Sequence, residues 1–186
     1  GGADFTNAEF GQLNYAQTKL PPGSSFKPYD YAALIDNTTN SGAGAVLYDT
    51  QGPLRGYPCT NKNRPKEDKT ADCLWDYDFR YPGPLTLRYS LGGSRNVPAV
   101  KAMLTVGVEK TISIAESMGL VSGYKCYHDE TLTQEAPCYG SAAIGDGAFL
   151  HLDEHINGYS TLSRLGAYIP QTYILKISDA GGKVID

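Results

Sequence analysis

Between Pro84 and Gly119 the sequence strings together apolar segments of helical period that glycines separate. The first, PLTLRYSL, ends at Gly92-Gly93; the second, VPAVKAMLTV, begins near Pro98; the third, VEKTISIAESMG, closes with Gly119. Proline is tolerated in the first turn of a helix, and glycine is favoured just after the last one. The pattern therefore predicts three consecutive helices.

Further elements are expected on both sides of this stretch. A helix is predicted over residues 24 to about 36, and a short strand over 45–48 within a long loop region, residues 37–82. A last helix is predicted in LHLDEHINGYSTLSRLG, where apolar residues recur at three- and four-residue steps and should pack in the core. These residues are Leu152, Ile156, Tyr159, Leu162 and Leu165.

The C-terminal segment YILKISDAGGKVID is typical of a β-hairpin. Tyr173, Leu175 and Ile177 alternate with other residues, so a strand would place them on one face. A turn is expected at residues 180–182, after which the chain resumes at Val184.

Length and charge limit the class of protein. The 186 residues suit one domain, and a hydrophobic content of 41% supports a packed core. A net charge of -4 with scattered basic residues argues against binding of nucleic acid, which needs clustered Lys and Arg. No run of 18 apolar residues could span a membrane. Because the chain begins with glycine, we expect a piece of a longer protein, with any targeting signal or anchor outside it.

Four cysteines form two local pairs, Cys59 with Cys73 and Cys126 with Cys138, each closing a short polar loop. An even number of cysteines in loops indicates disulfides and an oxidising, extracytoplasmic environment. The alternative is four free thiols in a cytosolic protein, which the spacing alone does not exclude.

No metal site and no cofactor are expected. Cys-x-x-Cys is absent, and His128, His151 and His155 form no ligand-spaced cluster with the cysteines. His151 and His155 are four residues apart, as on one helix face, but HLDEH differs from the zinc signature His-Glu-x-x-His. We therefore expect these two histidines to be solvated.

A serine three residues before a lysine, Ser24 and Lys27, occurs in PPGSSFKP. On a helix this spacing brings the amine within reach of the hydroxyl, one way to activate a serine nucleophile. The positive end of the helix dipole disfavours a protonated Lys27 and so favours a basic amine. The plainer interpretation is a helix cap beside a solvated lysine. The spacing is weak alone, because Ser122 and Lys125 repeat it in a loop with no helix start.

A second motif, Ser94-Arg95-Asn96, lies between two predicted helices after the Gly92-Gly93 break. A loop at this place can project two short polar side chains into a cleft. Ser94 or Asn96 could equally cap the next helix.

With their flanks, these motifs resemble the transpeptidase domain of class A, bifunctional penicillin-binding proteins. The resemblance rests on GGADF, PGSSFKPYDYAAL, DFRYPGPLTLRYSLGGSRNVPAVKAM and YSTLSRLGAYIPQTYILKISDAGGKVI, in collinear order over nearly the whole chain. It implies an α+β fold: residues 1–186 would be one partial domain, the helical part of a penicillin-binding-protein or serine β-lactamase-like fold, with most of the central antiparallel sheet outside this chain. The motif order selects Ser24 over Ser25.

The resemblance also implies an activity. Ser24 would attack the D-alanyl-D-alanine end of a peptidoglycan stem peptide and form an acyl-enzyme, with Lys27 as the proton acceptor. Ser94 would relay a proton towards the leaving amine, and Asn96 would bind the substrate amide and Lys27. β-Lactam antibiotics would acylate the same serine. The protein would work at the extracytoplasmic face of the cell membrane, anchored through a segment outside this chain.

The chain departs from the family at its third motif. Neither Lys-Thr-Gly nor Lys-Ser-Gly occurs in the 186 residues. We therefore expect a companion segment to supply that strand, with one oxyanion amide and the carboxylate site. The alternative is a catalytically inert scaffold or interaction fragment of a penicillin-binding protein. A β-lactamase is disfavoured by the flanks and by the lack of a deacylating carboxylate motif.

Overall fold

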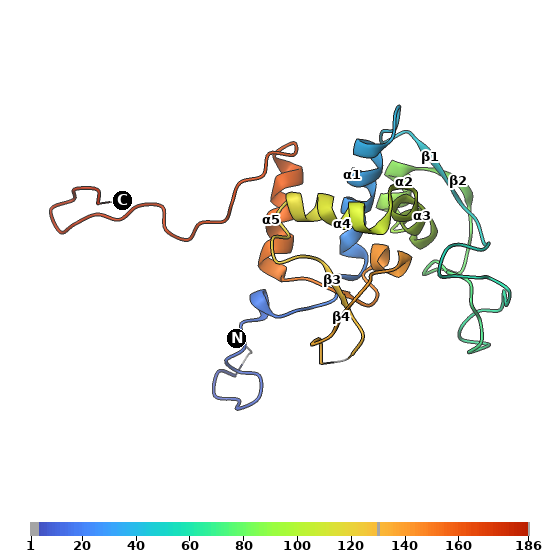
Figure 1. The fold of residues 1–186 in the computed structure, drawn as a ribbon, viewed down its shortest axis with the longest axis horizontal. Helices are drawn as coiled ribbons and strands as arrows, with labels where there is room; N and C mark the ends of the chain where they lie inside the picture. The colour runs from blue at the N-terminus through green and yellow to red at the C-terminus, as the bar shows by residue number, and fades with distance from the viewer. Residues whose placement is uncertain (1–3, 130, 186) are drawn as a thin grey trace.

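Helices form the body of the protein, and a long extended segment leads away from it to the C-terminus (Figure 1). The computed structural model describes residues 4–129 and 131–185. Its α-helices are α1 (Lys27–Asn37), α2 (Leu87–Gly92), α3 (Asn96–Val106), α4 (Val108–Ser117) and α5 (Leu152–Ser163). Short 3-10 turns are η1 (Tyr15–Gln17), η2 (Gly23–Phe26) and η3 (Gly140–Ile144). The three consecutive helices predicted downstream of residue 84 are thus formed, as α2, α3 and α4.

The core lies where α1 and α3 pack against each other and against η3. On α1, Tyr29 and Leu34 point inward, and on α3, Val97, Val100 and Met103 do so. Buried residues also occupy the consecutive positions 29–31 on α1 and 97–100 on α3, so both helices are buried on more than one side, as expected for helices at the centre of a core.

An aromatic contact joins the start of α1 to the chain after α4. Phe26 stacks on Tyr124 with ring centroids 3.9 Å apart, and both side chains are buried. Each buried aromatic contributes a large apolar area, so this pair ties η2 firmly to the core.

Two small antiparallel sheets accompany the helices. β1 (Val46–Asp49) pairs with β2 (Gly83–Thr86), and β3 (Lys125–Tyr127) lies between β4 (Glu135–Ala136) and β5 (Ala148–Phe149). The α+β expectation is confirmed, and the sheets within the described residues are short. GGADF can be followed only from Asp4, because its first three residues lie outside the described part.

Several element boundaries differ from the sequence prediction. The first helix opens as the 3-10 turn η2 and becomes α-helical only at Lys27, since Pro28 suits the first turn of an α-helix. The segment from Pro84, predicted as helix, begins as strand β2, because its backbone pairs with β1 before α2 starts. Residues 121–147, which include the second cysteine pair, contain β3, β4 and η3.

The prediction that the apolar stripe of the last helix packs in the core is wrong. Leu152, Ile156, Tyr159 and Leu165 are exposed, with 58% of the Ile156 surface accessible to solvent. The inward face of α5 instead carries residues with hydrogen-bonding groups or no side chain: Glu154, His155, Asn157, Gly158 and Thr161. The reason is steric at Gly158, where an added Cβ would lie 2.2 Å from the Tyr29 hydroxyl oxygen. Only the face of α5 that carries this glycine can therefore pack against Tyr29.

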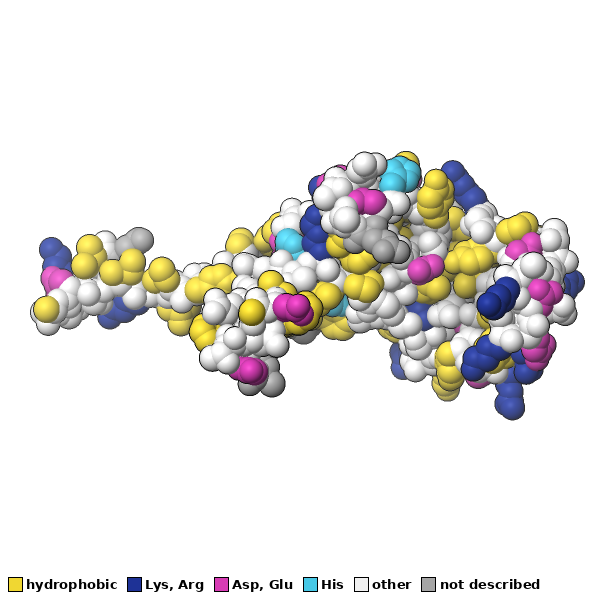
Figure 2. Space-filling view, turned by 90° about the horizontal axis from the view of Figure 1, so that it is seen from below, with side chains coloured by type: hydrophobic (Ala, Val, Ile, Leu, Met, Phe, Trp, Pro, Cys, Tyr) yellow, Lys and Arg dark blue, Asp and Glu magenta, His cyan; other side chains and the backbone are white. Residues whose placement is uncertain are grey.

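The C-terminal segment forms the predicted turn, but residues 164–185 contain no β-strand, only an isolated bridge on either side of the turn. Ser178 bridges to Val184, and the amide of Ile185 donates to the carbonyl of Ile177 at 2.8 Å. Figure 2 shows hydrophobic side chains along this projecting tail. Those that the tail exposes most are Tyr173, Ile174, Leu175 and Ile185.

Both predicted disulfides are formed, Cys59–Cys73 and Cys126–Cys138, which excludes the alternative of free thiols. No helix of the described residues is long and apolar enough to cross a membrane. In the same part of the chain, no cluster of His, Cys, Asp and Glu is arranged to hold a metal ion.

Candidate active site

Ser24 lies in η2, where the chain turns sharply into α1. Ser24 and Ser25 are both exposed, whereas Phe26 and Lys27, the next two residues, are fully buried. The turn needs glycine on both sides. Gly23 has φ +57°, and a Cβ on Gly145 would lie 2.1 Å from the Gly23 nitrogen. The backbone of this turn therefore leaves the two serines exposed, and close packing of Gly145 against Gly23 holds the turn in place.

The structure places Lys27 against the second motif. Its Nζ donates to the Ser94 carbonyl at 2.6 Å, to the Ser94 hydroxyl at 3.2 Å and to Asn96 Oδ1 at 2.7 Å. An ammonium group has three N–H donors, so these acceptors match its full capacity. Three of the four predicted site residues are thus in direct contact, and the fourth, Ser24, is one helical turn before Lys27.

Burial changes the acid–base behaviour of Lys27. Desolvation lowers the pKa of its amine to about 8, and the positive charge of Arg95 acts in the same direction. The carboxyl groups of Asp76 and Asp30 act against this and favour the charged amine. A buried lysine near this pKa can hold or release a proton close to neutral pH.

Asp30, one turn after Lys27 on α1, is fully buried. Neither carboxyl oxygen has a hydrogen-bond partner among the described residues. Burial raises the pKa of Asp30 well above its usual value, which favours the neutral acid.

Ser94 and Asn96 occupy the junction between α2 and α3. Ser94 has φ +49°, in the left-handed region, and the next residues return to ordinary geometry as α3 begins. Asn96 Nδ2 donates to the Trp75 carbonyl at 2.8 Å, and its backbone amide donates to Asp76. The side-chain amide is therefore held from one side, and its oxygen faces Lys27.

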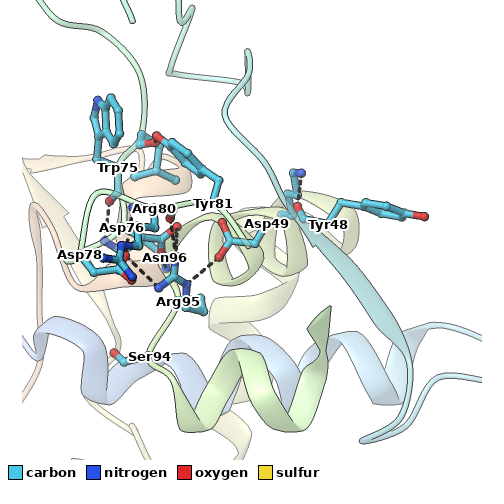
Figure 3. Close-up of polar contacts among 12 residues, drawn as sticks. Tyr48, Asp49, Trp75, Asp76, Asp78, Arg80, Tyr81, Ser94, Arg95 and Asn96 are labelled. Atoms are coloured by element: carbon cyan, nitrogen blue, oxygen red, sulfur yellow. Dashed lines mark hydrogen bonds and ion pairs between the residues drawn. The ribbon is translucent and has the colours of Figure 1, made fainter. Parts of the chain in front are cut away.

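Arg95, the middle residue of the motif, points the other way, into a buried group of carboxylates (Figure 3). Its guanidinium contacts Asp49 at 2.6 Å, Asp78 at 3.0 Å and Asp76 at 3.3 Å. Asp49 and Asp76 are almost completely buried, and Asp78 is partly exposed. These three aspartates were missed from the sequence, because they are far from the motif along the chain and match no spacing rule.

The pKa values of Asp76 and Asp78, two of the carboxyl groups around Arg95, are shifted in opposite directions. Burial is the main cause that raises the pKa of Asp76 to about 7, with the neighbouring Asp49 adding to it and Arg95 opposing it. The hydrogen bond from Arg95 lowers the pKa of Asp78. Arg95 itself stays charged, because these partners outweigh the cost of its burial and raise its pKa.

His155 is buried, so the expectation of a solvated histidine pair is wrong for this residue. Its Nε2 lies 2.8 Å from the Ser25 hydroxyl, and its Nδ1 lies 3.1 Å from the hydroxyl of Tyr29. Ser25 donates its own proton to the Pro22 carbonyl at 2.7 Å. The Tyr29 hydroxyl also donates to the His155 backbone carbonyl at 3.2 Å, so the histidine links α1 to the turn beside Ser24 through both Tyr29 and Ser25. The sequence signal was the four-residue spacing on α5, which leaves open which face is buried.

The second Ser-x-x-Lys match does not bring its two residues together. Ser122 donates to Glu154 at 2.5 Å, while Lys125 pairs with Glu135 at 2.6 Å. The expectation that this loop cannot aim its lysine at its serine is confirmed.

Comparison with known proteins points to one family. No family model matches the chain. The chain is 35% identical over 121 residues to Penicillin-binding protein 1A/1B of Bacillus subtilis, covering 61% of this chain and 11% of that protein. It is 27% identical over 187 residues to Penicillin-binding protein 1A of Escherichia coli, covering 100% of this chain and 19% of that protein. The chain thus spans a fifth or less of the length of these relatives.

Solved structures agree with this. The crystal structure of penicillin-binding protein 1A from Haemophilus influenzae matches with a TM-score of 0.65 at 25% identity, over 94% of this chain and 23% of that one. PonA1 of Mycobacterium tuberculosis in complex with penicillin V matches in fold, with a TM-score of 0.70 at 18% identity, over 94% and 43% of the two chains. The chain is therefore a homologue of class A penicillin-binding proteins and has the fold of part of their transpeptidase region.

Proposed function

We propose that this chain carries the helical half of a serine D,D-transpeptidase site, with Ser24 as nucleophile. The observation that carries the proposal is the position of the Lys27 amine, which contacts both Ser94 and Asn96 one turn after an exposed serine. A nucleophile, a base and a group that orients the base are the parts that acyl transfer needs.

In the proposed reaction Ser24 Oγ attacks the penultimate carbonyl of a D-alanyl-D-alanine stem peptide. An ester bond to Ser24 forms, and the C–N bond to the terminal D-alanine breaks. The Ser24 proton passes to Lys27 and, through the Ser94 hydroxyl, to the leaving amine. An amine of a second stem peptide then takes the acyl group and cross-links the two, which restores the Ser24 hydroxyl.

The contacts of Lys27 suit this proton transfer. A neutral amine has two N–H bonds, enough for the Ser94 carbonyl and Asn96 Oδ1, the two shorter contacts. Its lone pair is then free to take a proton from a hydroxyl. The longer contact, 3.2 Å to the Ser94 hydroxyl, gives the path by which the proton leaves.

Other parts of the proposed site lie outside residues 1–186. A companion segment would supply the Lys-Thr-Gly strand, an oxyanion amide and the site for the substrate carboxylate. β-Lactams would acylate Ser24 in place of the stem peptide. The two disulfides support an extracytoplasmic location, since such bonds persist in oxidising compartments.

The test is covalent labelling with a fluorescent penicillin, using the full chain that carries residues 1–186 together with its companion segment. We expect the label on Ser24, located by mass spectrometry of the digested protein, and we expect Ser24→Ala to abolish it. Ser25→Ala is the adjacent control and should keep the label on Ser24.

Two results would contradict the proposal. Label that survives Ser24→Ala would place the nucleophile elsewhere. Complete absence of label in a folded wild-type protein would favour the alternative, an inert scaffold derived from a penicillin-binding protein.

A further inference from the structure

We propose that Arg95 is a positioning residue, which orients Asn96 by anchoring the segment of residues 73–80 to strand β1. The inference rests on the proposed function, because it concerns how the acylation site is held. We call residues 73–80 the anchor segment.

The first step is that Asn96 depends on the anchor segment. The Trp75 carbonyl accepts from Asn96 Nδ2 at 2.8 Å, and the Asp76 carboxylate accepts from the Asn96 backbone amide. The first bond fixes which end of the side-chain amide points to Lys27, and the second holds the Asn96 backbone. If the anchor segment moves, Asn96 Oδ1 loses its register with the Lys27 amine.

The second step is that Arg95 holds the anchor segment in place. Its three nitrogen atoms contact Asp49 on β1, Asp76 and Asp78 on the anchor segment, and the carbonyl of Arg80 at its end. Arg95 is only 6% exposed, so these contacts are little screened by water. In Figure 3 the guanidinium lies between Asp49 on one side and Asp78 on the other.

The third step is that a disulfide begins the anchor segment. Cys73 is buried and bonded to Cys59, two residues before Trp75. Leu74, next in the chain, accepts a hydrogen bond at its carbonyl from the Tyr81 hydroxyl at 2.7 Å. Arg95 therefore binds the side chains of a segment whose first residue is held by a disulfide bond.

The guanidinium is suited to this task and an ammonium is not. Arginine offers five N–H donors in a planar fork, whereas lysine offers three donors at one point. Arg95→Lys keeps the charge but cannot reach Asp49 and Asp78 together, since they lie on opposite sides of the group.

The experiment measures the rate of acylation by a fluorescent penicillin in the full chain with its companion segment. We expect Arg95→Lys to slow acylation roughly ten- to a hundredfold, because small displacements of a catalytic group carry costs of this order. Arg88→Lys is the matched control: Arg88 is exposed on α2, and its variant should acylate at the wild-type rate. Equal rates for Arg95→Lys and wild type would overturn the inference.

A pH profile separates positioning from loss of folded protein. The Arg95 charge lowers the pKa of Lys27, and the Asp76 carboxylate raises it. Arg95→Met removes the Arg95 charge and also favours neutral Asp76, because Arg95 holds down the pKa of that carboxyl, so the midpoint of the acylation profile should differ from that of the wild type. A variant that merely lowered the folded fraction would keep the wild-type midpoint, and that outcome would contradict the inference. Asp78→Asn disturbs only the partly exposed partner and should slow acylation less, while remaining folded.

The disulfides offer a second, independent comparison. Cys59→Ser/Cys73→Ser opens the start of the anchor segment, whereas Cys126→Ser/Cys138→Ser opens a loop of similar length elsewhere. Both pairs should lower the melting temperature, but at equal folded fraction only the first should slow acylation. Equal slowing by both pairs, or by neither, would count against the inference. Absence of label on wild-type Ser24 is a different outcome, which overturns the proposed function itself.

Discussion

Lys27 Nζ lies 2.7 Å from Asn96 Oδ1, although the two residues are 69 positions apart in the sequence. The contact joins the first turn of α1 to the first residue of α3 and crosses the interface on which the core is built. Acid–base chemistry at Lys27 and packing of the helices are therefore coupled, and each can be tested separately.

The rate of acylation should rise with pH around the pKa of Lys27. The amine must be neutral to accept the Ser24 proton, and burial places its pKa at about 8. Below this value each pH unit should lower the rate about tenfold, and above it the rate should level off. Rates of β-lactam acylation between pH 6 and 10 measure this, and a flat profile would exclude Lys27 as the base.

Lys27→Arg should abolish most of the activity without removing the positive charge. Arginine cannot be deprotonated in proteins, so it cannot accept the proton. We expect acylation to fall by about 10²- to 10⁴-fold, the usual contribution of a general base. Lys110→Arg, on the exposed face of α4, should leave the rate unchanged. A rate for Lys27→Arg near that of wild type would contradict the prediction.

Asp30→Asn should be more stable relative to the wild type at high pH than at low pH. The pKa of buried Asp30 is raised above 3.8, so its contribution to the unfolding free energy is greatest below pH 3.8 and is lost as the pH rises towards the folded-state pKa. Asparagine has a similar shape and no charge, so this loss disappears. Urea unfolding between pH 4 and pH 8 measures the difference.

Asp36→Asn is the matched control for Asp30→Asn, because Asp36 is exposed on the same helix. Its pH dependence should match that of the wild type. Identical pH dependence of Asp30→Asn and wild type would show that Asp30 ionises freely in the folded protein.

His155 should make the protein sensitive to acid. Burial lowers the pKa of His155 below 6.5, so the unfolding free energy is unaffected above pH 6.5 and falls as the pH drops from there to the folded-state pKa. His155→Leu removes this component, and it costs about 1–3 kcal/mol at pH 8 because Tyr29 and Ser25 lose a partner. Thermal unfolding at pH 5 and pH 8 tests both effects, and His128→Leu, at an exposed histidine, is the control. If His155→Leu lost stability in acid as much as the wild type does, His155 would not be the source of the acid sensitivity.

Local patterns of the sequence predicted much of this fold. Glycines after PLTLRYSL and VPAVKAMLTV mark where α2 and α3 end, because termination by glycine is a property of the backbone itself. The cysteine pairs were equally readable, since each closes a loop within its own neighbourhood. Ser94 and Asn96 could be proposed because they form a short motif with informative flanks.

Features set by tertiary contacts were not predictable in the same way. The face of α5 that is buried is decided by what it packs against, and Tyr29 leaves room only for Gly158 and its polar neighbours. Strand β2 exists because β1 is there to pair with it. The aspartates around Arg95 come from two places in the chain, strand β1 and the anchor segment, and no local spacing links either of them to the Ser94-Arg95-Asn96 motif.

The two disulfides have a consequence for the order in which the protein assembles. Each joins cysteines only 14 or 12 positions apart, so closing either loop requires no long search by the chain. The loop ending at Cys73 can therefore be closed before α3 reaches α1. Asp76 and Asp78 would then contact Arg95 from a segment whose conformational entropy the disulfide has already reduced. The last step of assembly would be the docking of this segment against α3.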